Sequence, residues 1–117
     1  MSKWSRPWPI QRDAVKERSG GVCEVCRGSA EQIHHRQPRA MGGTRRPGVH
    51  MPANLLHVCA ACHRHIESHR SAALLNGWLV RQGQDPAVVP VLVDRGSRRV
   101  FLTADGRYSD DPPEAAA

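Results

Sequence analysis

Short apolar blocks, separated by stretches rich in Gly, Pro and Arg, run through the chain and predict helices and strands of modest length. Apolar residues at helical spacing, followed by residues that favour a helix end, mark two segments. Short apolar runs bounded by turn residues mark four strands. The predicted helices cover residues 10–19 and 60–79, and the predicted strands cover residues 30–35, 54–58, 88–93 and 99–103. The pattern therefore indicates an α+β fold with two hairpins.

Changes in composition divide the chain into four parts. These are an arm with a short helix (1–21), a core (22–80), a C-terminal β-hairpin extension (81–108) and an acidic, Pro-rich tail (109–117). The tail is expected to be disordered because it offers little apolar surface to bury. Inside the core, residues 37–50 (QPRAMGGTRRPGVH) predict a loop with a sharp turn at Gly42 and Gly43.

Composition changes this picture in two ways. The chain has 117 residues but only three Trp, one Tyr and one Phe, so burial alone gives a thin core that a structural metal would supplement. It also lacks an apolar run long enough for a transmembrane helix, and its N-terminus has no signal-peptide pattern. We therefore expect a cytoplasmic protein with reduced thiols and no membrane partner.

The net charge of +6 and the pI of about 9.9 favour a polyanionic partner. Among polyanions, nucleic acid is the most frequent partner of such proteins. A basic surface without a specific partner is the alternative on composition alone, because charge does not identify chemistry.

Residues 23–69 hold all four cysteines together with the histidines of the chain. The cysteines form two CxxC pairs, Cys23 with Cys26 and Cys59 with Cys62, separated by 32 residues. In a reducing compartment such pairs predict metal ligands rather than disulfides. Four thiolates at these spacings favour a tetrahedral, structural Zn²⁺ ion, with iron as the alternative.

The histidines need a second explanation, because a four-cysteine site leaves no position for them. His34 and His35 end a predicted strand, where neighbouring side chains point in opposite directions. One of them can then bind a metal while the other faces a substrate. His63 follows Cys62 at the start of the predicted helix, so the zinc site would bring all three histidines together.

Residues 22–72 resemble the HNH nucleases, also called ββα-metal or treble-clef nucleases. The motifs that carry the resemblance are CEVC, IHHRQP, MGG, ANLLHVC and CAACH, in the order that is typical of the family. The remaining sequence is similar, more weakly, to small HNH proteins of actinobacterial phages and their hosts. The resemblance implies a small treble-clef core held by a four-cysteine zinc site, followed by the C-terminal hairpin.

The resemblance also implies a metal-dependent DNA endonuclease whose products carry a 5′-phosphate and a 3′-hydroxyl. His35 matches the general base, which suits the near-neutral pKa of histidine. His34 and His63 match the ligands of a catalytic divalent metal, with Mg²⁺, Mn²⁺, Ni²⁺ and Zn²⁺ all compatible. Asn54 matches the residue that either orients the base through backbone hydrogen bonds or touches the metal.

The third ligand of that metal is left open by the motif. Either Glu67, one helical turn after His63, or water is preferred, while His69 is the alternative. His50 and His57 are expected to be structural or exposed. The arginines near these motifs are expected to grip DNA phosphates; they are Arg36, Arg39, Arg45, Arg46 and Arg64.

Nothing in these motifs predicts base recognition, so a protein partner, such as phage DNA-packaging machinery, would supply specificity. The main alternative function is a zinc module that binds nucleic acid without cutting it. A zinc-stabilised assembly protein is a third. Only the nuclease interpretation requires the order of His34, His35, Asn54 and His63.

Overall fold

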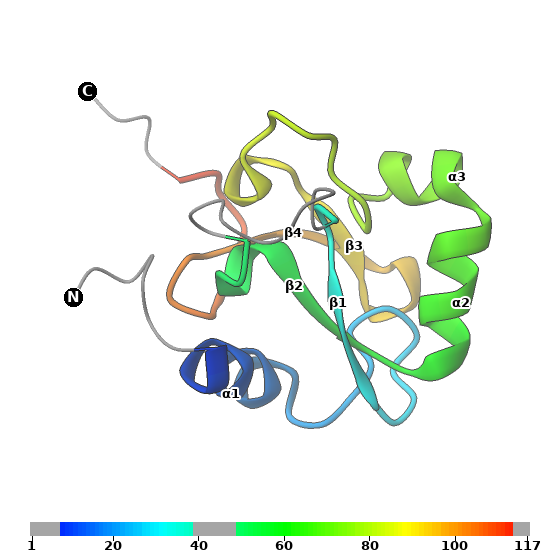
Figure 1. The fold of residues 1–117 in the computed structure, drawn as a ribbon, viewed down its shortest axis with the longest axis horizontal. Helices are drawn as coiled ribbons and strands as arrows, with labels where there is room; N and C mark the ends of the chain where they lie inside the picture. The colour runs from blue at the N-terminus through cyan, green and yellow to red at the C-terminus, as the bar shows by residue number, and fades with distance from the viewer. Residues whose placement is uncertain (1–7, 39–48, 114–117) are drawn as a thin grey trace.

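The computed structural model describes residues 8–38 and 49–113, which form an α+β fold with two small antiparallel sheets (Figure 1). The helices are α1 (Trp8–Ser19), α2 (Ala60–Ser68) and α3 (Arg70–Leu75). The first sheet pairs β1 (Gln32–His35) with β2 (Leu55–Val58). The second sheet has the order β3 (Val91–Val93), β4 (Arg98–Leu102) and β5 (Tyr108–Ser109). Short 3-10 turns cover Pro52–Asn54, Pro86–Val88 and Asp94–Gly96.

The two predicted hairpins are present, with shorter strands than the sequence pattern indicated. In the first hairpin, His34 pairs with Leu56 and His35 with Leu55. In the second, β3 is an edge strand and Pro90 lies immediately before it, where a missing backbone N–H costs no ladder hydrogen bond.

The predicted helix over residues 60–79 is divided into α2 and α3. His69 lies between them with φ −129° and ψ 62°, which is not a helical conformation. The Ser68 hydroxyl donates to the Arg64 carbonyl at 2.8 Å, an interaction with the preceding turn that competes with regular helical geometry. The break directs α3 away from the axis of α2.

The C-terminal sheet shares its core with the cysteine-rich segment. One apolar cluster contains Cys23, Leu56, Val58, Val93 and Val100, all completely buried. Residues 81–108 are therefore packed into the body of the fold and are not a separate extension.

Gly77 and Trp78 bring α3 close to the second sheet. A Cβ atom on Gly77 would lie 1.9 Å from the Pro90 carbonyl oxygen, so only glycine fits there. The Trp78 indole N–H donates to the Leu92 carbonyl at 2.8 Å.

A buried ion pair connects α1 to the rest of the molecule. Arg18 makes a bidentate contact with Glu24, with both N–O distances 2.9 Å and both side chains 1% exposed. The Tyr108 hydroxyl donates to the same carboxylate at 2.6 Å, and burial raises the pKa of Tyr108. A buried charge needs such partners, so this contact couples α1, the first CxxC segment and β5.

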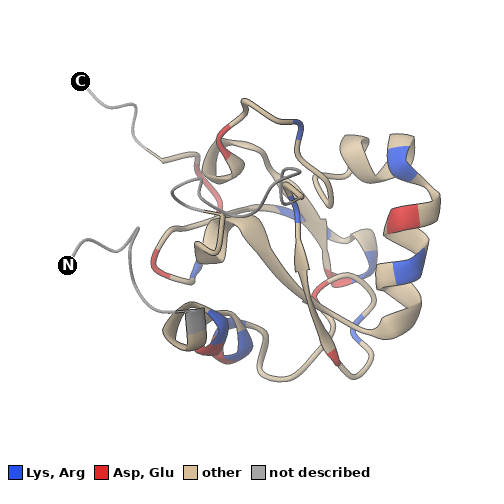
Figure 2. Ribbon diagram, in the orientation of Figure 1, with Lys and Arg blue, Asp and Glu red and all other residues tan. Residues whose placement is uncertain are grey.

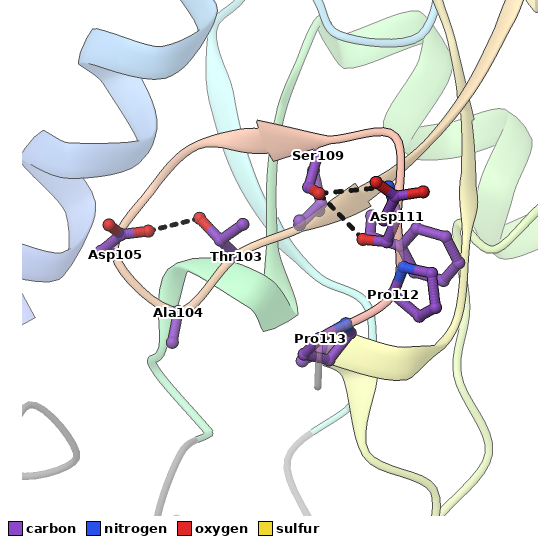
Figure 3. Close-up of a pocket in the computed structure, with 10 residues that line it drawn as sticks. Thr103, Ala104, Asp105, Ser109, Asp111, Pro112 and Pro113 are labelled. Atoms are coloured by element: carbon purple, nitrogen blue, oxygen red, sulfur yellow. Dashed lines mark hydrogen bonds between the residues drawn. The ribbon is translucent and has the colours of Figure 1, made fainter. Parts of the chain in front are cut away.

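The chain remains ordered beyond the predicted start of the tail. Ser109 pairs with Phe101 in the second sheet, and its hydroxyl donates to the Asp111 carbonyl at 2.8 Å (Figure 3). Placing the start of the tail at residue 109 was therefore wrong, while residues 114–117 lie outside the described part.

No helix within residues 8–38 and 49–113 is long and apolar enough to cross a membrane. The longest of them, α1, has 12 residues.

Candidate metal centre and histidine pocket

The four cysteines converge from two segments that are distant in sequence. One ligand atom from each of Cys23, Cys26, Cys59 and Cys62 lies within 4.8 Å of the others. The sulfur atoms of Cys26 and Cys59 are 3.7 Å apart. A tetrahedral site with Zn–S bonds of about 2.3 Å has sulfur–sulfur edges of about 3.8 Å. The arrangement of the four thiols is thus compatible with a structural zinc ion.

Local backbone geometry shapes each half of this cysteine site. In the first half, the Cys23 amide donates to the Gly28 carbonyl at 2.6 Å, which closes a tight turn around Cys26. In the second half, Cys59 precedes α2 and its sulfur accepts a hydrogen bond from the Cys62 amide at 3.3 Å. The positive end of a helix therefore faces a thiolate ligand.

The thiols respond differently to these surroundings. Burial opposes ionisation of Cys59, but hydrogen bonds from Cys62 and neighbouring thiols hold the pKa of Cys59 below its usual value. Burial raises the pKa of Cys62. Four thiolates together need a compensating cation, and metal binding would release the protons that remain.

The cysteine site is attached to the second sheet through backbone hydrogen bonds. The amides of Asp94 and Arg95 donate to the carbonyls of Glu24 and Val25 at 3.1 and 2.9 Å. Asp94 and Arg95 adopt positive φ angles of 53° and 58°, which non-glycine residues seldom do. The turn between β3 and β4 is thereby fixed against the first CxxC segment.

A separate pocket of about 270 Å³ is lined by residues of β1, α2 and the start of α3. It is lined by Ile33, His34, His35, Pro38, His63, Glu67, Arg70 and Leu79. The predicted base, both predicted histidine ligands and the preferred third ligand therefore share one pocket. We call this the histidine pocket.

His34 has the features of a metal ligand. Its Nε2 lies 2.7 Å from the Trp78 carbonyl oxygen, which can only accept, so the hydrogen is on Nε2 and the lone pair on Nδ1. Burial lowers the pKa of His34 to about 4, so the ring is neutral at pH 7. A neutral imidazole with its other nitrogen hydrogen-bonded is the usual state of a metal-binding histidine.

His63 and Glu67 form the α2 side of the histidine pocket. The His63 ring is 5.2 Å from the His34 ring, between centroids, and its Nε2 lies 3.3 Å from Glu67. His69 is directed elsewhere, since its ring stacks on His65 at 4.2 Å. The alternative that makes His69 the third ligand is thus not supported, and Glu67 is the carboxylate within reach of His63.

The histidine pocket is more open than the cysteine site. Among residues 8–38 and 49–113, only the four cysteines form a set of three or more potential ligands whose atoms all lie within 4.8 Å. His34, His63 and Glu67 line one pocket without meeting at one point. No second preformed metal centre is present among these residues.

Asn54 is 1% exposed, and its side-chain amide is used entirely inside the protein. The Asn54 Oδ1 accepts from the Gln37 amide at 2.8 Å, while Nδ2 donates to the carbonyls of Gln37 and Val49 at 3.2 and 2.8 Å. Of the two roles that the motif left open, contact with the metal is therefore wrong. Asn54 instead holds both ends of the loop that follows His35.

His50 reaches this region from the far end of the same loop. Its Nδ1 lies 3.0 Å from His35 Nε2, and the ring centroids are 5.2 Å apart. The sequence pattern had not connected the two residues, since nothing in the loop composition indicates how it closes. His57, by contrast, is buried and lies 2.7 Å from the Ser19 hydroxyl, in a structural position.

The prediction that Arg36 contacts DNA is wrong, because its side chain is completely buried. The Arg36 guanidinium donates four hydrogen bonds of 2.7–3.0 Å to the carbonyls of Gly77, Ala53, Pro86 and Val89. Burial lowers the pKa of Arg36 to about 9, which still leaves it charged at pH 7. It joins the end of β1 to three other segments of the chain, around residues 53, 77 and 86–89.

Other predicted phosphate contacts have different outcomes. Arg64 is exposed on α2. Arg70, a further arginine at the start of α3, lines the histidine pocket. Figure 2 shows basic residues on α2 and α3 with an acidic residue between them. Arg39, Arg45 and Arg46, with the Gly42–Gly43 turn, lie outside the described residues.

Comparison of the chain with family models, with curated proteins and with solved structures found no match. The family resemblance therefore rests on the motifs of the sequence, and the function must be argued from the cysteine site and the histidine pocket.

Proposed function

We propose that this protein is a metal-dependent DNA endonuclease of the HNH type, with a treble-clef core around the cysteine site. The observation that carries the proposal is the histidine pocket, in which His34, His35, His63 and Glu67 lie together. The order of a CxxC turn, a β-hairpin and a helix that begins at the second CxxC agrees with such a core.

His34 Nδ1, His63 and the Glu67 carboxylate would hold the catalytic divalent metal. The donor set fits such an ion, because it combines a neutral imidazole with a carboxylate that is 65% exposed at its side chain. When bound, a divalent ion stabilises negative charge on the phosphate and on the leaving 3′ oxygen. Since these donors do not converge as the cysteines do, we expect weaker and more exchangeable binding than at the cysteine site.

His35 would act as the general base. It takes a proton from water, the water oxygen forms a new bond to phosphorus, and the bond between phosphorus and the 3′ oxygen breaks. The leaving oxygen gains a proton from solvent, which yields a 5′-phosphate and a 3′-hydroxyl. Arg70 in the histidine pocket and the exposed Arg64 would bind the phosphate backbone.

Contacts of this kind hold the DNA backbone without reading base edges. Sequence or structure specificity would then come from a partner protein, for which phage DNA processing or packaging is one setting. The cysteine site would serve the same reaction indirectly, because it fixes the start of α2, and with it His63, relative to β1.

One observation favours a second candidate function. The four cysteines form the single convergent ligand set among the described residues, as expected for a zinc module that binds nucleic acid without cleaving it. That function leaves the shared position of His34, His35, His63 and Glu67 without a purpose.

Plasmid cleavage separates the two functions. Purified protein is incubated with supercoiled plasmid in EDTA, Mg²⁺, Mn²⁺, Ni²⁺ or Zn²⁺, beside His35→Ala, whose folding and zinc content are measured in parallel. We expect metal-dependent nicking or linearisation that falls by roughly 10²–10⁴-fold in His35→Ala, the usual contribution of a general base. A zinc-loaded protein that shifts DNA but cleaves it with none of these metals would establish the binding module instead.

A further inference from the structure

Two further cavities adjoin the histidine pocket along α3. The first, of about 370 Å³, shares Pro38, Arg70 and Leu79 with the histidine pocket. The second, of about 420 Å³, shares Leu74, Leu79 and Arg81 with the first. Since Leu79 lines all three, the cavities follow one another without interruption. We call the two additional cavities together the α3 groove.

We infer that the α3 groove binds an unpaired DNA strand where it leaves the histidine pocket, with Arg70 and Arg81 on its phosphates. The inference rests on the proposed function, because it extends the path of the strand that would be cut. It also names a substrate class, which is DNA with an unpaired strand beside the scissile phosphate.

The floor of the α3 groove is apolar and held by the core. Leu79 is 3% exposed and lies in a buried cluster with Ile66 and Ala73, against which Leu74 packs. In the second cavity, the Leu75 residue is 79% exposed. A duplex presents mainly sugars and charged phosphates to such a surface, because its bases are stacked and paired. An unpaired strand can instead lay its bases against the leucines and remove apolar surface from water.

The charges along the α3 groove favour a polyanion. Arg70 lines its first cavity and Arg81 lines both, and neither guanidinium pairs with an acidic side chain of the described residues. Among the described residues that line the three cavities, Glu67 is the only acidic one, and it lies in the histidine pocket. By contrast, the pocket in Figure 3 is lined by Asp105 and Asp111 and by no cation. Electrostatic attraction therefore directs a DNA strand to the α3 groove.

Hydrogen bonds fix the backbone of Arg81 relative to the histidine pocket. The Gln37 side chain is 7% exposed as a residue, and its Nε2 donates to the Arg81 carbonyl at 2.7 Å. The amide of Val80, the residue before Arg81, donates to the Arg36 carbonyl at 2.8 Å. Both partners directly follow His35 in the chain. The segment that ends β1 thus determines where Arg81 stands beside the pocket.

Fluorescence anisotropy of labelled oligonucleotides, without added divalent metal, tests the α3 groove independently of cleavage. The probes are an oligothymidylate and its duplex with oligoadenylate. We expect the wild type to bind the single strand roughly 5- to 10-fold more tightly than the duplex, the lower end of what one base contact contributes. Equal or weaker binding of the single strand would overturn the inference.

Arg81→Gln tests the phosphate contact, with Arg107→Gln as the matched control. Arg107 is 81% exposed at its side chain and lies between β4 and β5, outside the groove. The slope of log affinity against log salt concentration should fall by about 0.7 in Arg81→Gln only, the change for one phosphate of a single strand. In cleavage, KM should rise with kcat unchanged. The same slope in wild type and Arg81→Gln, or equal decreases in both variants, would overturn the inference.

Leu75→Glu tests the apolar floor, with Ile10→Glu as the matched control. Ile10 is an apolar residue of α1 that is 49% exposed and lies outside the groove. Single-strand binding should weaken roughly 5- to 10-fold in Leu75→Glu and stay near the wild-type value in Ile10→Glu. Circular dichroism and zinc content establish that the variants are folded.

Two other outcomes separate the alternatives. A wild-type dimer that dissociates in Leu75→Glu with unchanged oligonucleotide affinity, measured by sedimentation, would assign the groove to a second copy of the chain and overturn the inference. A wild type that cleaves no DNA, but loses single-strand affinity in Arg81→Gln and Leu75→Glu, would overturn the proposed nuclease and confirm the α3 groove as a binding site.

Discussion

The cysteine site and the histidine pocket both include residues of α2, yet they are built differently. The cysteine ligands all lie within 4.8 Å, and backbone hydrogen bonds fix both CxxC turns. The histidine pocket encloses about 270 Å³, and its donors are held by other protein groups rather than directed to one point. Closed ligand sets are typical of structural metals, while catalytic sites keep room for water and substrate.

This difference predicts a division of labour between neighbouring residues. Cys62 and His63 are adjacent in sequence, but Cys62 belongs to the cysteine site and His63 lines the histidine pocket. Changes at the cysteine site should then act first on folding, and changes in the histidine pocket first on metal exchange and cleavage. The predictions below test this comparison, beginning with the largest effect.

Cys59→Ser should abolish cooperative folding. Zinc binding contributes about 10–16 kcal/mol in zinc-finger peptides, which exceeds or equals the whole stability of most small domains. Circular dichroism during thermal unfolding, together with the zinc content, measures the effect. A Cys59→Ser protein with a sharp unfolding transition and one zinc per chain would show that the cysteine site does not hold the fold.

Arg36→Met should lower the free energy of unfolding by about 3–5 kcal/mol, because four buried or partly buried carbonyls lose their donors. The matched change Arg64→Met, on the exposed face of α2, should leave stability unchanged and weaken DNA binding. Urea unfolding and a DNA-binding titration distinguish the two arginines. If Arg36→Met weakened DNA binding as much as Arg64→Met and left the free energy of unfolding unchanged, Arg36 would be a phosphate contact after all.

Glu67→Gln should weaken the binding of the catalytic ion by roughly 10- to 100-fold, since it removes the carboxylate next to His63. The control is His69→Ala, which removes a histidine that stacks on His65 outside the histidine pocket. The Mn²⁺ concentration for half-maximal cleavage should rise in Glu67→Gln only. A higher Mn²⁺ requirement in His69→Ala but not in Glu67→Gln would identify His69 as the ligand.

The pH dependence of stability should show the buried state of His34. Its pKa is lowered from 6.5 to about 4 in the folded protein, so the unfolded chain binds the proton more readily between these values. Stability is therefore complete above pH 6.5 and falls as the pH decreases, by about 1 kcal/mol at pH 6 and about 2 kcal/mol at pH 5. His34→Gln, which keeps a donor for the Trp78 carbonyl without titrating, should lose less over the same range in urea unfolding. Parallel pH curves for both proteins would contradict a buried, neutral His34.

Each half of the cysteine site was predictable from sequence because the geometry of a CxxC pair is local. The two cysteines of each pair are three residues apart, and the second pair lies at the start of a helix, so both can reach one ion. That the two pairs meet was inferred from their matching pattern and is seen only in the fold. The alternation of His34 and His35 along β1 also follows from local strand geometry, and it agrees with the different partners of the two rings.

The burial of Arg36 and the approach of His50 were not predictable in this way. The burial of Arg36 depends on carbonyls of residues 53, 77, 86 and 89, and the position of His50 depends on the Asn54 amide, which binds Gln37 and Val49. The motif contains Asn54 but does not indicate which backbone groups it binds. Likewise, the break at His69 separates His69 from the histidine pocket, although residues 60–79 carry one continuous helical pattern.

Native mass spectrometry of the wild type and of His63→Ala, each in excess Zn²⁺, tests most directly whether two metal sites exist with different tasks. We expect two ions on the wild type, of which EDTA removes one without unfolding the chain, and one chelator-resistant ion on His63→Ala. Cleavage should follow the removable ion and return when a divalent metal is added. A single ion on both proteins, or unfolding together with removal of the first ion, would contradict a catalytic metal in the histidine pocket.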